Sequence, residues 1–171
     1  MSKAVTNVII AGLGGQGVIT CSDILADAAF RSGMDVKKAE VHGMAQRGGS
    51  VNTDVRFGTR VFSPSVPPGE ADFLLAVDST QVDHNLPLLR PGGVIIRPEM
   101  IDPARLASKR SMNVALLGIL STHLSLTETV WMEAIRATLA EKLHEGNVAA
   151  FRIGRETAGS AVAPAQSGRE G

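Results

Sequence analysis

Apolar and polar positions near the start of the chain change their spacing at a cluster of glycines. Residues 8–11 form a continuous apolar run, which is typical of a buried strand, and residues 18–30 repeat apolar side chains at helical spacing. Between them, Gly12, Gly14 and Gly17 follow the Gly-x-Gly-x-x-Gly pattern. The pattern therefore predicts a strand, a tight turn and a helix.

The chain between residues 34 and 97 is predicted to supply the rest of a sheet. An alternating pattern over 51–57 predicts an antiparallel hairpin that turns at Gly58-Thr59 and returns over 60–63. A proline-rich loop over 64–69 cannot join a sheet interior. The other strands are expected at 34–40, 71–78 and 94–97, with a turn over 90–93 before the last.

The C-terminal part of the chain is predicted to be helical. Asp78 and Ser79 can cap a helix, residues 113–120 read as a buried helix, and a last long helix is expected to end at Gly146. The expected apolar face of that last helix carries Trp131, Ile135, Leu139 and Leu143. Residues 147–154 are expected to dock on a sheet edge.

Together these elements predict an α/β fold. We expect a Rossmann-like, doubly wound and mostly parallel sheet with an inserted β-hairpin and C-terminal helices. Residues 1–155 are expected to form one domain and residues 156–171, which are small and polar, a disordered tail.

Composition narrows the possible functions. Seventeen basic residues balance seventeen acidic ones, so no net field attracts nucleic acid or an anionic membrane, and no apolar run suits a membrane span. The single cysteine, Cys21, excludes an internal disulfide and a self-contained iron–sulfur cluster, and we expect it to be structural. The first strand leaves no room for a signal peptide, so a cytoplasmic location is expected.

The glycine turn is the first candidate site. The first glycine would permit a sharp turn, the second would let phosphate approach the backbone, and the third would let the helix pack closely. Free N–H groups of the following helix would face the anion. Glu40 lies near the spacing at which dinucleotide folds place an acid on ribose, although a solvated glutamate fits equally well. Alternatively, the turn needs glycine geometry and binds nothing.

The second candidate site is the glycine-bearing segment over 41–51, which has no apolar periodicity. Its run Arg47-Gly48-Gly49-Ser50 is a good anion receptor. A glycine-rich connection with a surface arginine is the alternative. Because loops from neighbouring strands meet at a common crevice, the two segments are predicted to face each other. The candidate binding residues are Gly12, Gly14, Gly15, Gln16, Gly17, His42, Gln46, Arg47, Gly48, Gly49 and Ser50; no catalytic residue or metal ligand is assigned.

With both segments in view, the sequence resembles the gamma-type domain of 2-oxoacid:ferredoxin oxidoreductases (the pyruvate/ketoisovalerate oxidoreductase catalytic domain family). Within that family it is most similar to the beta subunits of indolepyruvate enzymes. The His-Gly-Met-x-Gln-Arg-Gly-Gly run is the most specific match. The resemblance rests on residues 12–17, 42–51, 69–72, Asn113 with 117–118, and Asn147 with 150–151.

The resemblance implies a role in oxidative decarboxylation of a 2-oxoacid to an acyl-coenzyme A. It implies that thiamine diphosphate, Mg²⁺ and iron–sulfur clusters belong to a larger catalytic partner, which passes electrons to ferredoxin. This chain would cover the active site, help to bind coenzyme A and be inactive alone. We expect Met44 and the loop over 64–68 to supply an apolar surface for that partner.

Two other functions stay open at this point. One is a stand-alone NAD-dependent dehydrogenase, which needs a catalytic base and offers His42 and His84. A chain of 171 residues would be small for both a cofactor and a substrate domain. The other is a nucleotide-binding regulatory module without chemistry of its own.

Overall fold

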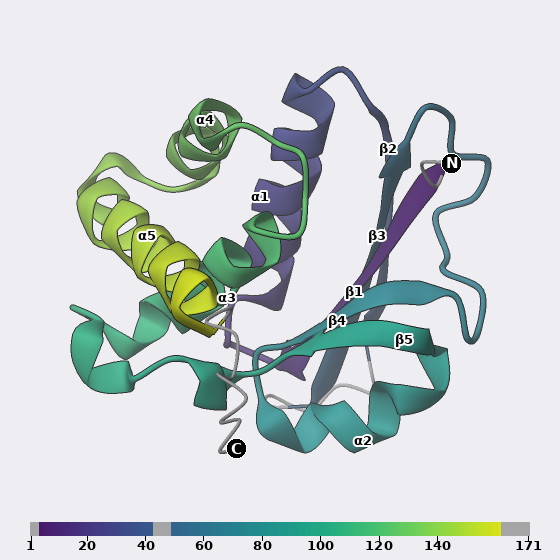
Figure 1. Ribbon diagram of the computed structural model, residues 1–171, viewed down its shortest axis with the longest axis horizontal. Coiled ribbons are helices and arrows are strands. Elements are labelled where there is room, and N and C mark those ends of the chain that lie inside the picture. The colour runs from purple at the N-terminus through teal and green to yellow at the C-terminus, as the bar shows by residue number, and fades with distance from the viewer. Residues whose placement is uncertain (1–3, 43–48, 162–171) are drawn as a thin grey trace, which may run out of the picture.

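The computed structural model describes residues 4–42 and 49–161, which build one five-stranded sheet and a layer of helices (Figure 1). The strands are β1 (Val5–Leu13), β2 (Asp35–His42), β3 (Ser50–Gly58), β4 (Ala71–Ala76) and β5 (Leu89–Ile96). The α-helices are α1 (Val18–Arg31), α2 (Val82–Asn85), α3 (Met112–Ser121), α4 (Glu128–Thr138) and α5 (His144–Ala161). Single 3₁₀ turns are η1 (Ser79–Gln81), η2 (Leu86–Leu88), η3 (Pro98–Met100), η4 (Pro103–Arg105), η5 (Lys109–Ser111) and η6 (Glu141–Leu143).

The sheet has the order β2-β3-β1-β4-β5, and β3 alone runs against the other strands. It pairs antiparallel with β1 on one side and with β2 on the other. The predicted α/β class and the presence of an antiparallel strand in a largely parallel sheet are therefore confirmed. The predicted return strand over 60–63 is wrong, because these residues form no strand and the hairpin partner of β3 is β2.

The polar face of β3 explains why no return strand forms. Side chains alternate between the two faces of a strand, and Val55 and Phe57 join the main core under the helices. On the opposite face, Asp54 Oδ2 accepts a hydrogen bond from the Val66 N–H at 2.8 Å. From the same face Arg56 Nη1 donates to the Ser63 carbonyl at 2.8 Å. Residues 59–66 thus lie over the sheet as an anchored loop.

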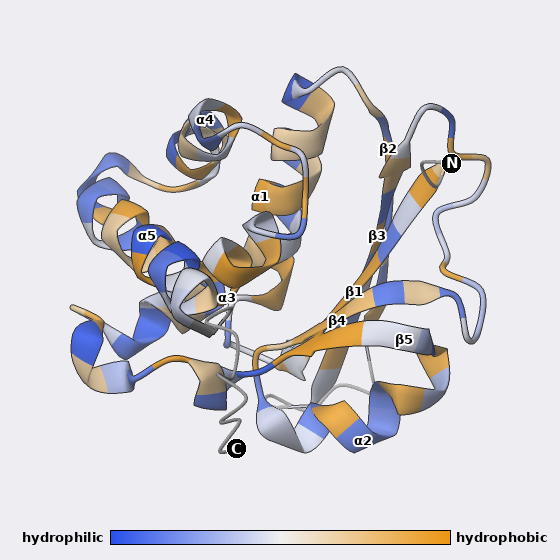
Figure 2. Cartoon of the chain, viewed as in Figure 1, coloured by the Kyte–Doolittle hydropathy of each residue, from blue (hydrophilic) through white to orange (hydrophobic). Residues whose placement is uncertain are grey.

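The two faces of the sheet are covered unequally. Figure 1 shows α1, α3, α4 and α5 gathered on one side, and Figure 2 shows apolar residues concentrated on β1, β4 and α3. The other face has a smaller apolar cluster, formed by Ile9, Ala11, Val66, Ala71 and Leu74. Its cover is the loop over 59–70 with the short α2–η2 segment, so the layer on this face of the doubly wound sheet is the thinner of the two.

The segment around β5 also differs from the expected pattern. The turn predicted over 90–93 lies inside β5, where Gly92 has a φ of +74° and the pairing with β4 shifts register. The helix expected after Asp78 is reduced to η1, α2 and η2, and Leu89 belongs to the strand. Residues 90–93 read as a turn in the sequence because glycine is typical of turns. Here glycine instead allows an irregularity inside a continuous strand.

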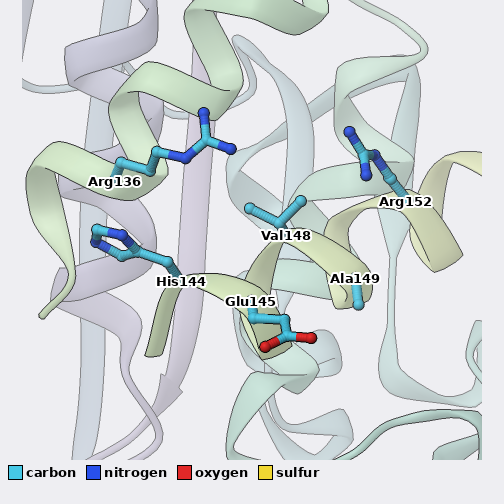
Figure 3. Close-up of a pocket in the computed structure, with 6 residues that line it drawn as sticks. All are labelled: Arg136, His144, Glu145, Val148, Ala149 and Arg152. Atoms are coloured by element: carbon cyan, nitrogen blue, oxygen red, sulfur yellow. The ribbon is translucent and has the colours of Figure 1, made fainter. Parts of the chain in front are cut away.

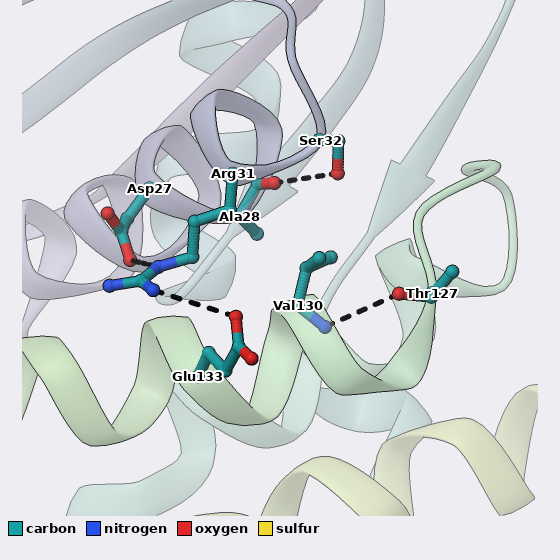
Figure 4. A network of polar contacts seen from close by, with 7 residues as sticks. All are labelled: Asp27, Ala28, Arg31, Ser32, Thr127, Val130 and Glu133. Atoms are coloured by element: carbon teal, nitrogen blue, oxygen red, sulfur yellow. Dashed lines mark hydrogen bonds and ion pairs between the residues drawn. The ribbon is translucent and has the colours of Figure 1, made fainter.

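Polar contacts tie the end of α1 to α4 (Figure 4). Arg31 Nε lies 2.6 Å from Asp27 Oδ2, and Arg31 Nη1 lies 3.6 Å from Glu133 Oε2 on α4. The hydroxyl of Thr127 caps α4 by accepting from the Val130 N–H. These pairs are partly exposed, so each contributes little, and the packing of buried Trp131 and Ile135 holds α4 in place.

The last two helices begin and end at different residues from those that the sequence pattern predicts. The helix expected to run to Gly146 ends at Thr138, and α5 begins at His144 with Gly146 inside it. The segment over 147–154 is therefore helical and packs on α3 rather than on a sheet edge. Helix α5 continues to Ala161, beyond the expected domain boundary at 155, and the rest of the expected tail lies outside the described residues.

Two glycines allow α3 and α5 to cross closely. A Cβ added at Gly154 would overlap the Ala115 carbonyl, and one added at Gly118 would overlap the Phe151 carbonyl. Backbone atoms cannot move aside as a flexible side chain can. Glycine is therefore required at position 154 for α3 and α5 to cross this closely, and its effect on helix propensity is secondary.

The close crossing of α3 and α5 predicts that alanine substitutions at two glycines of α5 change the stability in opposite directions. Gly154→Ala should destabilise the protein by about 1–3 kcal/mol or more, because α3 and α5 must separate. Gly146→Ala should stabilise it by about 0.5–1 kcal/mol, since nothing lies within 4 Å of the added Cβ. Urea unfolding of both variants measures the two changes, and an equal effect at both positions would contradict the close crossing.

Candidate functional site

The glycine turn between β1 and α1 is built by close packing. A Cβ at Gly12 would lie 2.6 Å from Val18 Cγ2, and one at Gly17, whose φ is +77°, would lie 2.5 Å from Asn113 Nδ2. Gly15 also has a positive φ, +86°, but faces open space. The turn therefore needs glycine for steric reasons at its first and third pattern positions, as the strand–turn–helix prediction requires.

Gln16 connects the turn to the carboxyl end of β4. Its Oε1 accepts the Leu13 N–H at 2.8 Å, and its Nε2 donates to Asp78 Oδ2 at 2.8 Å. Asp78 also accepts from the Thr80 hydroxyl and N–H, so it caps η1. Donation from Thr80 and Gln16 lowers the pKa of Asp78 below its usual range. A carboxylate thus lies beside the turn and is held in its ionised form.

The structure brings the second glycine-bearing segment against this turn. The Gly14 N–H donates to the Gly49 carbonyl at 2.9 Å, and Ser50 pairs with Leu13 across β3 and β1. The contact was expected from two neighbouring parallel strands, but it arises because β3 lies between β1 and β2. Gln46, Arg47 and Gly48 lie outside the described residues, as does the side chain of His42.

These contacts limit which backbone donors can face an anion. The N–H groups of Leu13 and Gly14 are already bonded to Gln16 and Gly49, so the backbone at the second pattern glycine is not bare. The first bond within α1 runs from the Cys21 N–H to the Gly17 carbonyl. The N–H groups of the first turn of α1 therefore lack partners within the helix, and this makes them candidate donors for a ligand.

The dinucleotide interpretation of Glu40 is wrong. In a dinucleotide fold the acid-bearing strand neighbours the glycine turn, whereas here β3 separates β2 from β1. Glu40 Oε1 lies 3.0 Å from Lys38 Nζ in an ion pair on β2. His84, offered above as a base for NAD chemistry, is exposed on α2. The geometry thus disfavours a stand-alone dehydrogenase.

Asn113 is a residue that sequence reasoning left without a role. It is 5% exposed, and its Nδ2 donates to the Gly17 carbonyl at 3.0 Å, which joins the start of α3 to the start of α1. Its signals in the sequence are a polar residue at the beginning of an apolar helix and its place among the residues that carry the family resemblance. Asn113 thereby fixes the helix end that carries the free donors.

Cys21 occupies the same buried junction. Its side chain is inaccessible to solvent, and Sγ lies 3.7 Å from the Asn113 carbonyl. Burial raises the pKa of the Cys21 thiol far above its usual range, so the thiolate needed for nucleophilic or metal chemistry is disfavoured. Within 4–42 and 49–161, no three His, Cys, Asp or Glu side chains are grouped to hold a metal ion.

A separate cleft of about 420 Å³ lies between α4 and α5 (Figure 3). Arg136 from α4 and Arg152 from α5 lie on either side of Val148, and Glu145 and Ala149 lie on the same helix as Val148. All of its lining residues come from α4 and α5, so this cleft does not complete the glycine site.

The chain is thus an α/β domain whose glycine turn is closed by a second glycine-bearing segment. A family model described as pyruvate ferredoxin/flavodoxin oxidoreductase matches residues 7–157. Indolepyruvate oxidoreductase subunit IorB of Thermococcus kodakarensis is 36% identical over 152 residues, covering 86% of this chain and 72% of that protein. Subunit IorB of Archaeoglobus fulgidus is 30% identical, covering 86% and 92%.

Solved structures share the fold. The gamma subunit of a keto/oxoacid ferredoxin oxidoreductase from Geobacter sulfurreducens matches with a TM-score of 0.76 and 23% identity, covering 91% of this chain and 99% of that one. A 2-oxoglutarate:ferredoxin oxidoreductase from Magnetococcus marinus, solved with 2-oxoglutarate, coenzyme A and succinyl-CoA bound, matches with a TM-score of 0.81 and 21% identity, covering 98% of this chain and 33% of that one.

The chain belongs to the pyruvate ferredoxin/flavodoxin oxidoreductase family. It is a subunit of a 2-oxoacid:ferredoxin oxidoreductase, as the resemblance implied. In the described part of the chain, every helix is too short or too polar to cross a membrane.

The bridge from Gln16 to Asp78 predicts a pH effect. Because the folded-state pKa of Asp78 is lowered, its contribution to stability is present above the unfolded value of about 3.9 and is lost as pH falls through the folded value. Asp78→Asn keeps a capping side chain but removes the charge. The wild type should be the more stable protein at pH 7, and the difference should shrink below about pH 4. Urea unfolding across this range measures it; a difference independent of pH would contradict the bridge.

Proposed function

We propose that this chain is the gamma-type subunit of a thiamine-diphosphate-dependent 2-oxoacid:ferredoxin oxidoreductase. In this role it covers the active site of a larger partner and contributes to binding coenzyme A. The hydrogen bond from the Gly14 N–H to the Gly49 carbonyl carries the proposal, because it holds the start of β3 against the glycine turn. Indolepyruvate or another aryl pyruvate is the favoured substrate, since several relatives are named indolepyruvate oxidoreductase subunits.

The redox chemistry is assigned to the partner because this chain has too few thiolates for an iron–sulfur cluster. An iron–sulfur cluster needs about four thiolates, and the one cysteine of this chain is buried with its thiol protonated. Thiamine diphosphate, Mg²⁺ and the clusters are therefore proposed to reside on the large subunit, which delivers electrons to ferredoxin. This chain supplies binding and exclusion of water.

Coenzyme A is the ligand proposed for the joined glycine segments. Its phosphates match the guanidinium of Arg47 and the N–H groups in the first turn of α1, which have no partner within the helix. The Magnetococcus relative was solved with coenzyme A bound, which supports this class of ligand. The carboxylate of Asp78 repels a phosphate placed directly beside it, so the phosphates are expected on the side of the turn nearer Gly49.

The assignment predicts that the isolated chain is inactive. Purified alone, it should be colourless and should not reduce a dye in the presence of indolepyruvate and coenzyme A, because the cofactors lie on the partner. Activity should appear when the large subunit is added. Dye reduction by the chain without any partner would refute the assignment.

Arg47→Ala tests coenzyme A binding in the reconstituted complex. The KM for coenzyme A should rise about ten- to hundredfold while the KM for the 2-oxoacid and the assembly stay unchanged, because one charge-assisted contact is lost. Arg47→Lys keeps the charge but not the forked donor, so its KM for coenzyme A should lie between those of the wild type and Arg47→Ala.

The alternative role of Arg47 is an ion pair across the subunit interface. In that case Arg47→Ala should split the complex on a sizing column, while any assembled enzyme keeps its KM for coenzyme A. An unchanged KM together with normal assembly would exclude both roles for Arg47.

A further inference from the structure

The loop over 59–70 exposes an aromatic side chain. Phe62 is 84% exposed, more than any other large hydrophobic side chain among the residues the structure describes. Pro64, Pro67 and Pro68 on the same loop are exposed as well. The guanidinium carbon of Arg60 lies 5.2 Å from the centre of the Phe62 ring. The loop thus presents an apolar patch with one cation stacked beside it.

Phe62 is held between two anchored points. Before it, the buried Val61 donates its N–H to Asp35 Oδ2 at 2.7 Å and accepts from Lys37 Nζ at 2.6 Å. After it, Arg56 Nη1 donates to the carbonyls of Ser63 at 2.8 Å and Ser65 at 3.2 Å. These contacts come from side chains of β2 and β3, so the sheet itself fixes the loop.

This anchoring prepares the patch for burial. A loop that is already ordered loses little conformational entropy when it binds, and aromatic side chains are frequent centres of binding energy. The carbonyls of Ser63 and Ser65 are already paired with Arg56, so a partner can cover them without leaving them unpaired. The patch is therefore suited to a protein interface.

We propose that Phe62 is the anchor through which this chain binds the large partner subunit. Its ring enters an apolar pocket of that subunit, and Arg60 faces a carboxylate on the rim of the pocket. The charge of Arg60 selects an acidic rim. The proposal rests on the proposed function, because it takes the large catalytic subunit as the occupant. Met44, which was also expected at this interface, lies outside the described residues.

Phe30 provides a matched control for Phe62. It is 70% exposed and belongs to the last turn of α1. Lys38, on the face of β2 that meets α1, donates to Ser22 Oγ, whereas its neighbour Lys37 holds the loop. Successive residues of a strand point to opposite faces, so Phe30 and Phe62 lie on opposite sides of the sheet.

Titration calorimetry of the purified large subunit with the full chain tests the proposal. Phe62→Ala should raise the Kd by about 30-fold or more, and Arg60→Ala should raise it by a smaller factor. Phe30→Ala should leave the Kd within about twofold. All three variants should unfold at the wild-type temperature, because the replaced side chains are exposed.

The outcomes separate this proposal from the proposed function. A wild-type chain that does not bind the large subunit would refute the proposed function, and the anchor with it. Normal wild-type binding with an unchanged Kd for Phe62→Ala would overturn the anchor alone. An equal loss for Phe30→Ala would also overturn it, because binding would then follow exposed apolar area rather than this loop. If the wild-type chain self-associates and Phe62→Ala abolishes only that association in sedimentation, Phe62 belongs to an interface between two copies and the proposal is overturned.

Discussion

The pairing of β3 with β1 is the interaction on which the other features depend. The register runs from Leu13 opposite Ser50 to Val5 opposite Gly58, so β3 follows β1 along its whole length. Because β3 runs antiparallel, its first residues lie beside the carboxyl end of β1, where the glycine turn begins. Its last residues lie at the other end of the sheet and lead into the loop that carries Phe62.

This arrangement links the proposed ligand site and the proposed partner surface through one strand. The contact of Gly14 with Gly49 stands at one end of β3. The polar face of the same strand holds the loop near the other end, through Asp54 and Arg56. Burial of Asp54 raises the pKa of its carboxyl, so keeping the charge there costs stability, which the N–H of Val66 partly offsets. The strand thus gives up some stability to position a loop.

Local patterns in the sequence were sufficient for the elements that have a clear periodicity of their own. The apolar run before Gly12, the helix after it and the buried helix over 113–120 follow from periodicity alone. The position of β3 between β2 and β1 does not, because strand order depends on pairings between distant residues. Alternation over 51–57 shows a two-faced strand but does not identify its neighbours.

Glycines in the chain show a second limit of local reasoning. Gly146 reads as a helix end and Gly154 as the end of an edge segment, yet both lie inside α5. The close approach of α3 at Gly154 is a contact with Ala115, far away in the sequence, that no local pattern contains. The two segments of the candidate site were predicted from the sequence. The roles of Gln16 and Asn113 were not, because these side chains bond to Asp78 and Gly17, respectively, which only the fold brings near them.

In the proposed function, the glycine turn and the segment beside it form one coenzyme A surface in the assembled enzyme. Amide hydrogen exchange of the reconstituted complex, with and without coenzyme A, tests this most directly. Coenzyme A should slow exchange in residues 13–20 and 43–51 together and leave the α4–α5 cleft unchanged. Protection confined to the large subunit, or found in this chain only between α4 and α5, would contradict it.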